Sequence, residues 1–259
     1  MPADDVRKAQ RDAARIIKQV QEERSGLGAP VRRSFVEREE GSAQATPLAE
    51  VLSHRSGNRR GGGGRGGGTR LTLELSLLWV LAKHPHETKR PLRFWAELLG
   101  LPDPQGVGAD RVRNAMRGLE ERGLIAISSA ETPGYPSIVR LRNEVTKGPY
   151  GIPSGKGDPY LRVPEAFWTR GLVSELSGPG VAMYLVVLAM HGPDTESVWF
   201  RAESFRNRFG LAESTRKAGL KDLVENFVLD AESQPIGSAG GRTWRRNVYT
   251  LAPQYRRPA

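Results

Sequence analysis

Two stretches of the chain carry cationic and hydrogen-bonding side chains at helical spacing. They are ADRVRNAMRGLEERGLI at 109–125 and ESTRKAGLKDLVENFVL at 213–229. In each, apolar residues recur every three or four positions, which is the pattern of one buried helix face. The side chains selected on the other side are Arg111, Arg113, Asn114 and Arg117 in the first stretch and Ser214, Thr215, Lys217 and Lys221 in the second. These residue types hydrogen-bond base edges and hold phosphates. The pattern therefore predicts two helices that can bind nucleic acid.

Short polar side chains predict where these helices start, because a side-chain oxygen can accept from the first backbone N–H groups. We expect Asp110 to cap the first helix and Ser214 or Thr215 to cap the second. Arg216 aligns with the apolar Val112 when the stretches are superposed. It is therefore expected on the core side.

The flanking sequence repeats as well. WVLAKH at 79–84 aligns with VVLAMH at 186–191, and WAELLGL at 95–101 aligns with FRNRFGL at 205–211. Each cationic helix is preceded by two apolar-faced helices and followed by two short β-rich runs around turn-forming residues. Each copy therefore predicts three helices and a β-hairpin, and 197–200 adds a strand candidate.

This order resembles winged-helix DNA-binding domains, and its tandem occurrence resembles replication initiators of plasmids and phages. The segment RVPEAFWTRGLVSEL at 162–176 also resembles actinobacterial proteins of that type. The resemblance covers 71–255. It implies a third helix in the major groove and a hairpin, the wing, on backbone or minor groove. Arg242, Arg245 and Arg246 would then lie on the second wing.

The expected fold class is mainly α with small β-hairpins, as two winged-helix domains behind a disordered arm. The expected divisions are an amphipathic helix (1–24), a disordered basic linker (25–70), a first domain (71–145), a linker (146–158) and a second domain (159–255).

The amino-terminal arm carries half of the net charge of +10. Residues 4–23 show an apolar stripe suited to self-association, to a protein partner, or to loose packing on the chain itself. The Gly-rich part, with Arg55, Arg59, Arg60, Arg65 and Arg70, predicts either a flexible arm that contacts phosphates or a plain linker. It lacks the lysine of a phosphate-binding loop.

Composition favours a nucleic-acid partner. The sequence pI is about 10.2, and arginine supplies 31 of the 39 basic residues. A GC-rich genome would produce the same bias. The first domain has a net charge of only +1 and the remainder +4, so the second copy and the arm are the stronger expected contact surfaces. With no cysteine, disulfides and thiolate metal sites are excluded.

No residue set predicts catalysis, a metal or a cofactor. His84 and His86 flank Pro85 at a helix end, and Ser214 and Lys217 match a penicillin-binding motif by letters only. The longest apolar run, 181–190, is half of a membrane span. We expect a cytoplasmic, nucleoid-associated protein without membrane contact. It would bind double-stranded DNA, with sequence specificity, as a transcriptional regulator or replication initiator. The alternative is a winged-helix scaffold that binds proteins.

Overall fold

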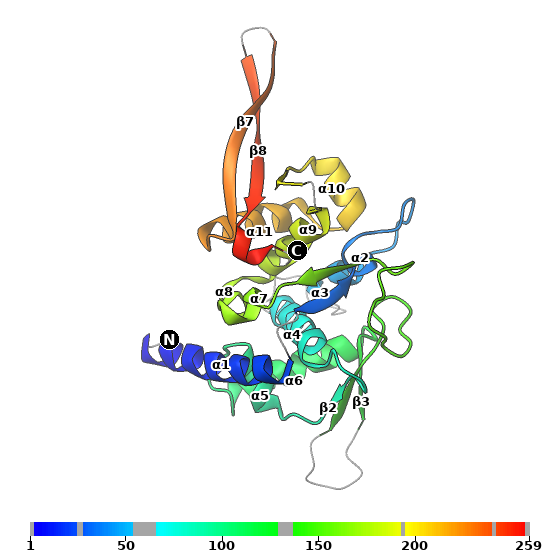
Figure 1. Cartoon of the computed structure of the whole chain (residues 1–259), viewed down its shortest axis with the longest axis vertical. Coiled ribbons are helices and arrows are strands. Elements are labelled where there is room, and N and C mark those ends of the chain that lie inside the picture. Colours follow the sequence, from blue (N-terminus) through cyan, green and yellow to red (C-terminus); the bar gives the residue numbers. More distant parts are fainter. Residues whose placement is uncertain are drawn as a thin grey trace, which may run out of the picture.

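The computed structural model describes residues 3–24, 28–53, 66–128, 137–192, 195–239 and 242–256, with backbone only for 3–6, 238, 239, 242 and 243. It repeats one order of elements (Figure 1). The first copy, the N-terminal unit, contains α4 (Gly66–Val80), β2 (Glu87–Thr88), α5 (Leu92–Leu98), α6 (Val107–Glu120), β3 (Ile125–Ser128) and β4 (Ile138–Leu141). The second copy, the C-terminal unit, contains α9 (Gly178–Met190), β6 (Ser197–Val198), α10 (Ala202–Phe209), α11 (Glu213–Glu225), β7 (Leu229–Ala239) and β8 (Arg242–Leu251).

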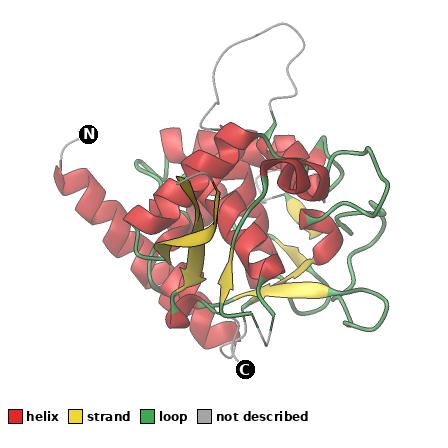
Figure 2. Ribbon diagram, turned by 90° about the horizontal axis from the view of Figure 1, so that it is seen from above, coloured by secondary structure: helices red, strands yellow, loops and turns green. Residues whose placement is uncertain are grey.

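The sheets of the two units correspond too. Their strand orders are β2-β4-β3 and β6-β8-β7, and every pairing is antiparallel. Helices outweigh the sheets, which are small (Figure 2). The prediction of a mainly α fold with small β-hairpins is confirmed. β7 runs from Leu229 to Ala239, so the first strand of the second hairpin is longer than the short β-rich run expected.

The centre of the molecule is the contact between α4 and α9. α9 is apolar all round and is buried from Gly180 to Ala189, as a central helix requires. Gly68 and Gly178 allow close approach, because a Cβ atom on Gly68 would lie 3.1 Å from the Gly178 Cα. The glycines at 66–68 are therefore part of α4 and not part of a linker.

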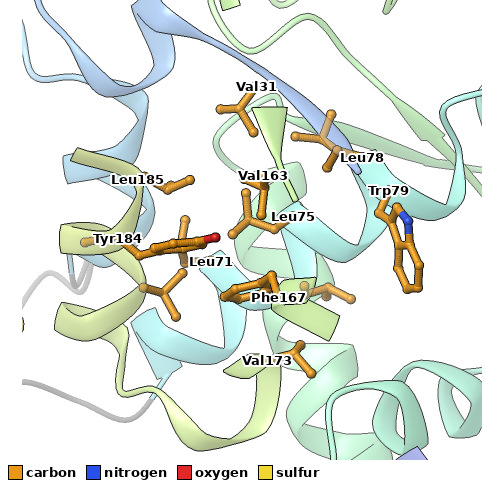
Figure 3. Close-up of a cluster of buried hydrophobic side chains, with 14 of the residues drawn as sticks. Val31, Leu71, Leu75, Leu78, Trp79, Val163, Phe167, Val173, Tyr184 and Leu185 are labelled. Carbon is orange, nitrogen blue, oxygen red and sulfur yellow. The ribbon is translucent and has the colours of Figure 1, made fainter. Parts of the chain in front are cut away.

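One hydrophobic cluster extends through both units (Figure 3). It includes β5 (Tyr160–Val163), α7 (Ala166–Thr169) and α8 (Leu172–Glu175), which connect the units. Trp168 of α7 stacks on Trp79 of α4, with ring centroids 4.4 Å apart. Phe167 stacks on Tyr184 of α9. The connecting segment is therefore packed against both units.

The segment 28–53 is folded, which corrects the predicted disorder over 25–70. It forms β1 (Ala29–Arg32), α2 (Arg33–Val36) and α3 (Pro47–Leu52). β1 pairs with β5, and five large apolar side chains of the segment are fully buried: Val31, Phe35, Val36, Leu48 and Val51. Tertiary contacts stabilise elements this short, and their scattered apolar residues show no period. Residues 54–65 lie outside the described part of the chain.

α3 lies between the two units and bonds to both. At its start, Thr46 Oγ1 donates to the Phe209 carbonyl of the C-terminal unit, at 3.0 Å. At its end, Arg70 Nε donates to Val51 O at 2.9 Å, and Arg122 Nε to Glu50 O at 2.8 Å. Arg70 and Arg122 belong to the N-terminal unit and are buried. Arg70, grouped with the phosphate-contacting arginines by sequence, therefore has a structural role.

α1 (Ala3–Arg24) packs on α5 and α7. The predicted stripe is buried at Ala9, Ala13, Ile16, Ile17 and Val20. Of the three expectations for this helix, the structure agrees with packing on the chain itself, since α5 and α7 cover the stripe. The chain ends with a 3-10 turn, η1 (Pro253–Tyr255).

Glu74 of α4 is fully buried, and neither carboxylate oxygen has a hydrogen-bond partner in the described part of the chain. Burial and the nearby Glu144 raise the pKa of Glu74 well above its ordinary value of 4.5. The unfolded chain releases this proton more readily than the folded protein does. The free energy of unfolding should therefore fall as the pH rises above 4.5, and it should level off once the pH exceeds the pKa of Glu74 in the folded protein. The loss amounts to about 1.4 kcal/mol per pH unit in that window.

Glu74→Gln should therefore raise the free energy of unfolding at neutral pH and flatten its pH dependence. The slope should shrink without vanishing, since burial also raises the pKa of Glu144. Urea unfolding at a series of pH values measures this. Glu203→Gln, at an exposed acid, is the control and should leave the slope unchanged. An equally steep slope in both variants would contradict the assignment.

Candidate nucleic-acid interface

α6 turns one side to the core and one to solvent. Val112, Ala115, Met116 and Leu119 are buried. The four residues selected by sequence, Arg111, Arg113, Asn114 and Arg117, are all exposed. Arg113 is ion-paired with Asp110 one turn earlier.

α11 is arranged in the same way. Gly219, Leu220 and Leu223 are buried. Ser214, Lys217 and Lys221 are exposed, and Thr215 is half-buried. The side chains of the two lysines are 75% and 74% exposed, so both are accessible to a ligand.

Among the described residues, Lys217 and Lys221 have weak ion-pair partners. Lys217 Nζ lies 3.8 Å from Glu213 Oε1, and Lys221 Nζ lies 3.6 Å from Glu225 Oε1. Exposed pairs of this kind contribute less than about 1 kcal/mol. A phosphate can therefore replace either carboxylate at little cost.

Arg216 has the core-side position expected for it. Its side chain is 14% exposed, donates to Phe200 O at 3.3 Å, pairs with Glu213, and lies over the Phe205 ring. These contacts hold α11 against α10.

Both predicted caps are wrong. α11 begins at Glu213 after Ala212, so Ser214 and Thr215 lie inside the first turn. α6 begins at Val107, and Asp103 accepts the N–H groups of Gly106 and Val107. Asp110 is then a first-turn residue.

A groove of about 740 Å³ lies beside α6. It gathers four arginines, Arg90, Arg93, Arg113 and Arg117, with Glu120 and residues of β3 and β4. Sequence reasoning missed Arg90 and Arg93, although RPLR at the start of α5 is a visible cationic cluster. Arg90 pairs with Glu23 and stacks on Phe94, and Arg93 Nε lies 2.6 Å from Glu97.

The strands β7 and β8 form a ribbon that projects from the helices (Figure 1). Arg245 donates to Ser233 O at 2.6 Å and to Ser233 Oγ at 3.0 Å. Arg246 lies 4.4 Å from the ring centroid of Trp199, which Arg201 approaches at 5.2 Å. Sequence reasoning missed Trp199 and Arg201.

Some selected residues lie outside the described part. Arg59, Arg60 and Arg65 are outside it altogether, and Arg242 begins β8 with an undescribed side chain.

The structure brings Arg113 and Arg117 together at one groove. The two hairpins point to opposite ends of the long axis, so the selected residues form two separate surfaces (Figure 1).

Within the described ranges, no three His, Cys, Asp or Glu side chains gather as metal ligands. No described helix has the length and apolarity to cross a bilayer.

No family model, curated protein or solved structure matches this chain.

Proposed function

We propose that the protein binds double-stranded DNA through two winged-helix units. One observation carries the proposal: α6 and α11 expose equivalent positions. Asp110, Arg113, Asn114 and Arg117 correspond to Ser214, Lys217, Ala218 and Lys221 at one constant offset. In both units a third helix leads into a hairpin of the same strand order.

The shape and the side chains of the exposed helices suit the major groove of DNA, which supports the proposal. A helix enters the major groove, where Arg, Lys, Asn and Ser side chains read base edges. The exposed side of α11 has two accessible ammonium groups, and β7–β8 adds guanidinium groups on the same unit. The C-terminal unit is therefore the principal contact, with α6 as the second.

Equilibrium binding to a mixed-sequence duplex over a salt series tests this function. Each phosphate contact contributes about −0.9 to the slope of log K against log salt, so several contacts give a steep slope. No binding at low salt would reject the proposal.

A scaffold role is the second candidate, favoured by Phe227. This residue follows α11, has φ of 55° and is 83% exposed. The equivalent residue of the N-terminal unit is Gly123, with φ of 65°. A bulky residue in the left-handed region is strained, and an exposed aromatic there suits a protein partner. Absence of DNA binding together with capture of a partner through Phe227 would favour this role.

The specific role as regulator or initiator is tested by selecting bound sequences from a random pool. Directly repeated sites would support replication initiation. A single short palindrome would support transcriptional regulation by a dimer.

Replacing Arg59, Arg60 and Arg65 together with serine should make the salt slope shallower by about 2.7 if all three contact phosphates. Deleting 1–70 would be uninformative, because it removes β1, α2 and α3 from the core. The measurement is the same salt series, and Lys8→Ala, at an exposed α1 residue, is the control. An unchanged slope would leave the arginines as a linker.

A further inference from the structure

The outer part of the β7–β8 ribbon exposes two large apolar side chains. Ile236 and Trp244 are each 55% exposed. Gly237 is paired with Trp244 and Pro235 with Arg245, so Ile236 occupies the bulge between these pairs. The two apolar residues are thus neighbours across the strands. Ile236 lies between Pro235 and Gly237 in the chain, and Trp244 is followed by Arg245 and Arg246.

Charge is segregated along the ribbon. Asp230 and Glu232 lie near its base, whereas 233–248 contains three arginines and no acid. Stacking on Trp199 holds Arg246, and two hydrogen bonds to Ser233 hold Arg245. The apolar pair therefore has cations beside it that are already fixed in position.

The ribbon is long enough to reach past the body of its unit. β8 has 10 residues, or about 33 Å at roughly 3.3 Å per residue. Its buried residues are Val248 and Leu251, and β6 pairs only with Tyr249 and Thr250. From Val248 outward, β8 pairs with β7 alone among the described strands. The corresponding strands β3 and β4 have 4 residues each.

We propose that Trp244 and Ile236 form an apolar wedge that enters a minor groove between base pairs and bends the duplex. This proposal rests on the proposed DNA-binding function. Apolar side chains inserted at a base step unstack it and bend the duplex toward the major groove. Arg245 and Arg246 neutralise the phosphates beside the step. Their charge favours nucleic acid over a protein surface.

The test uses the full chain and a duplex of roughly 30 base pairs labelled at both ends for energy transfer. Wild-type protein should bring the ends closer together. Trp244→Ala should abolish most of this change and weaken binding about tenfold, the scale of one lost aromatic–base stack. Ile236→Ala should give a smaller loss, and Trp244→Phe should retain the bend because it keeps an aromatic plane.

Ile152→Ala is the matched control, since Ile152 is 53% exposed and lies in the loop between β4 and β5. It should bind and bend DNA as wild type does. Thermal unfolding of each variant checks that the fold is intact.

If Trp244→Ala binds and bends DNA like wild type, the wedge is refuted and DNA binding stands. If Trp244→Ala changes only the sedimentation of the free protein, the pair is a protein contact and the wedge is refuted. If wild-type protein fails to bind the duplex at low salt, the proposed function itself fails.

Discussion

Replacing Lys217 and Lys221 together with alanine should weaken binding to duplex DNA by roughly tenfold to a hundredfold. Both ammonium groups are exposed on the outer side of α11, and their acidic neighbours are too far away to hold them tightly. The salt slope should become shallower by about 1.8, corresponding to two lost phosphate contacts. Fluorescence anisotropy over a salt series measures both quantities.

The matched control removes the same charge elsewhere. Lys8 and Lys18 are exposed lysines of α1, and their double alanine variant should keep the affinity within about twofold and the salt slope near wild type. Equal losses in both double variants would mean that net charge alone drives binding, and α11 would then not be the recognition helix.

Arg32→Ala should lower the free energy of unfolding by about 3–5 kcal/mol, the usual cost of leaving a buried charge without its partner. Arg32 lies at the end of β1 and is buried. It pairs with the buried Glu144, donates to Asp158 at 2.9 Å and to Gly151 O at 2.5 Å. The substitution therefore leaves Glu144 unpaired and releases the loop between β4 and β5, to which Gly151 and Asp158 belong. Denaturant unfolding gives the energy, and the midpoint temperature should fall by roughly 10 °C.

Arg140→Ala provides the comparison, because Arg140 pairs with Glu87 near the surface. The Arg140 side chain is 46% exposed and the Glu87 side chain is 27% exposed. It should cost less than about 1 kcal/mol. Adding Glu144→Gln to Arg32→Ala should recover part of the loss by removing the buried charge. If Arg32→Ala unfolds like Arg140→Ala, the buried pair does not stabilise the fold.

The helices and hairpins were predictable because their patterns are local. In α11, the three-residue spacing of Leu220 and Leu223 placed the buried side of the helix correctly. Phe227 continues the same period, but it lies after the end of the helix and is 83% exposed. The all-apolar run of α9 indicated a central helix. Comparison of the two copies placed Arg216 on the core side.

The amino-terminal segment was not predictable because tertiary contacts determine it. Val31 and Phe35 are buried only because β5, α4 and α9 lie beside them. The glycines at 66–68 suggested flexibility, but the missing side chains allow α4 and α9 to approach each other. Glycine is common both in low-complexity segments and where two helices pack closely, so its presence alone does not tell these cases apart.

The candidate site was predictable only where a local pattern determines it. The exposure of Arg111, Arg113, Asn114 and Arg117 follows from helix period alone. The use of other arginines does not, since Arg70 and Arg122 satisfy backbone carbonyls at the end of α3. A high arginine content therefore does not separate exposed arginines, which are candidates for ligand binding, from arginines that stabilise the fold.

The bonds of α3 to both units also bear on which DNA sites the protein could use. A short helix fixed at one end to Phe209 and at the other to Arg70 and Arg122 joins the units without a flexible tether. Under the proposed function, the separation and rotational phase of the two DNA contacts are then set by the folded chain. Two half-sites would be bound together only at one spacing along the turn of the double helix, and a change of a few base pairs would leave one of the units off the DNA.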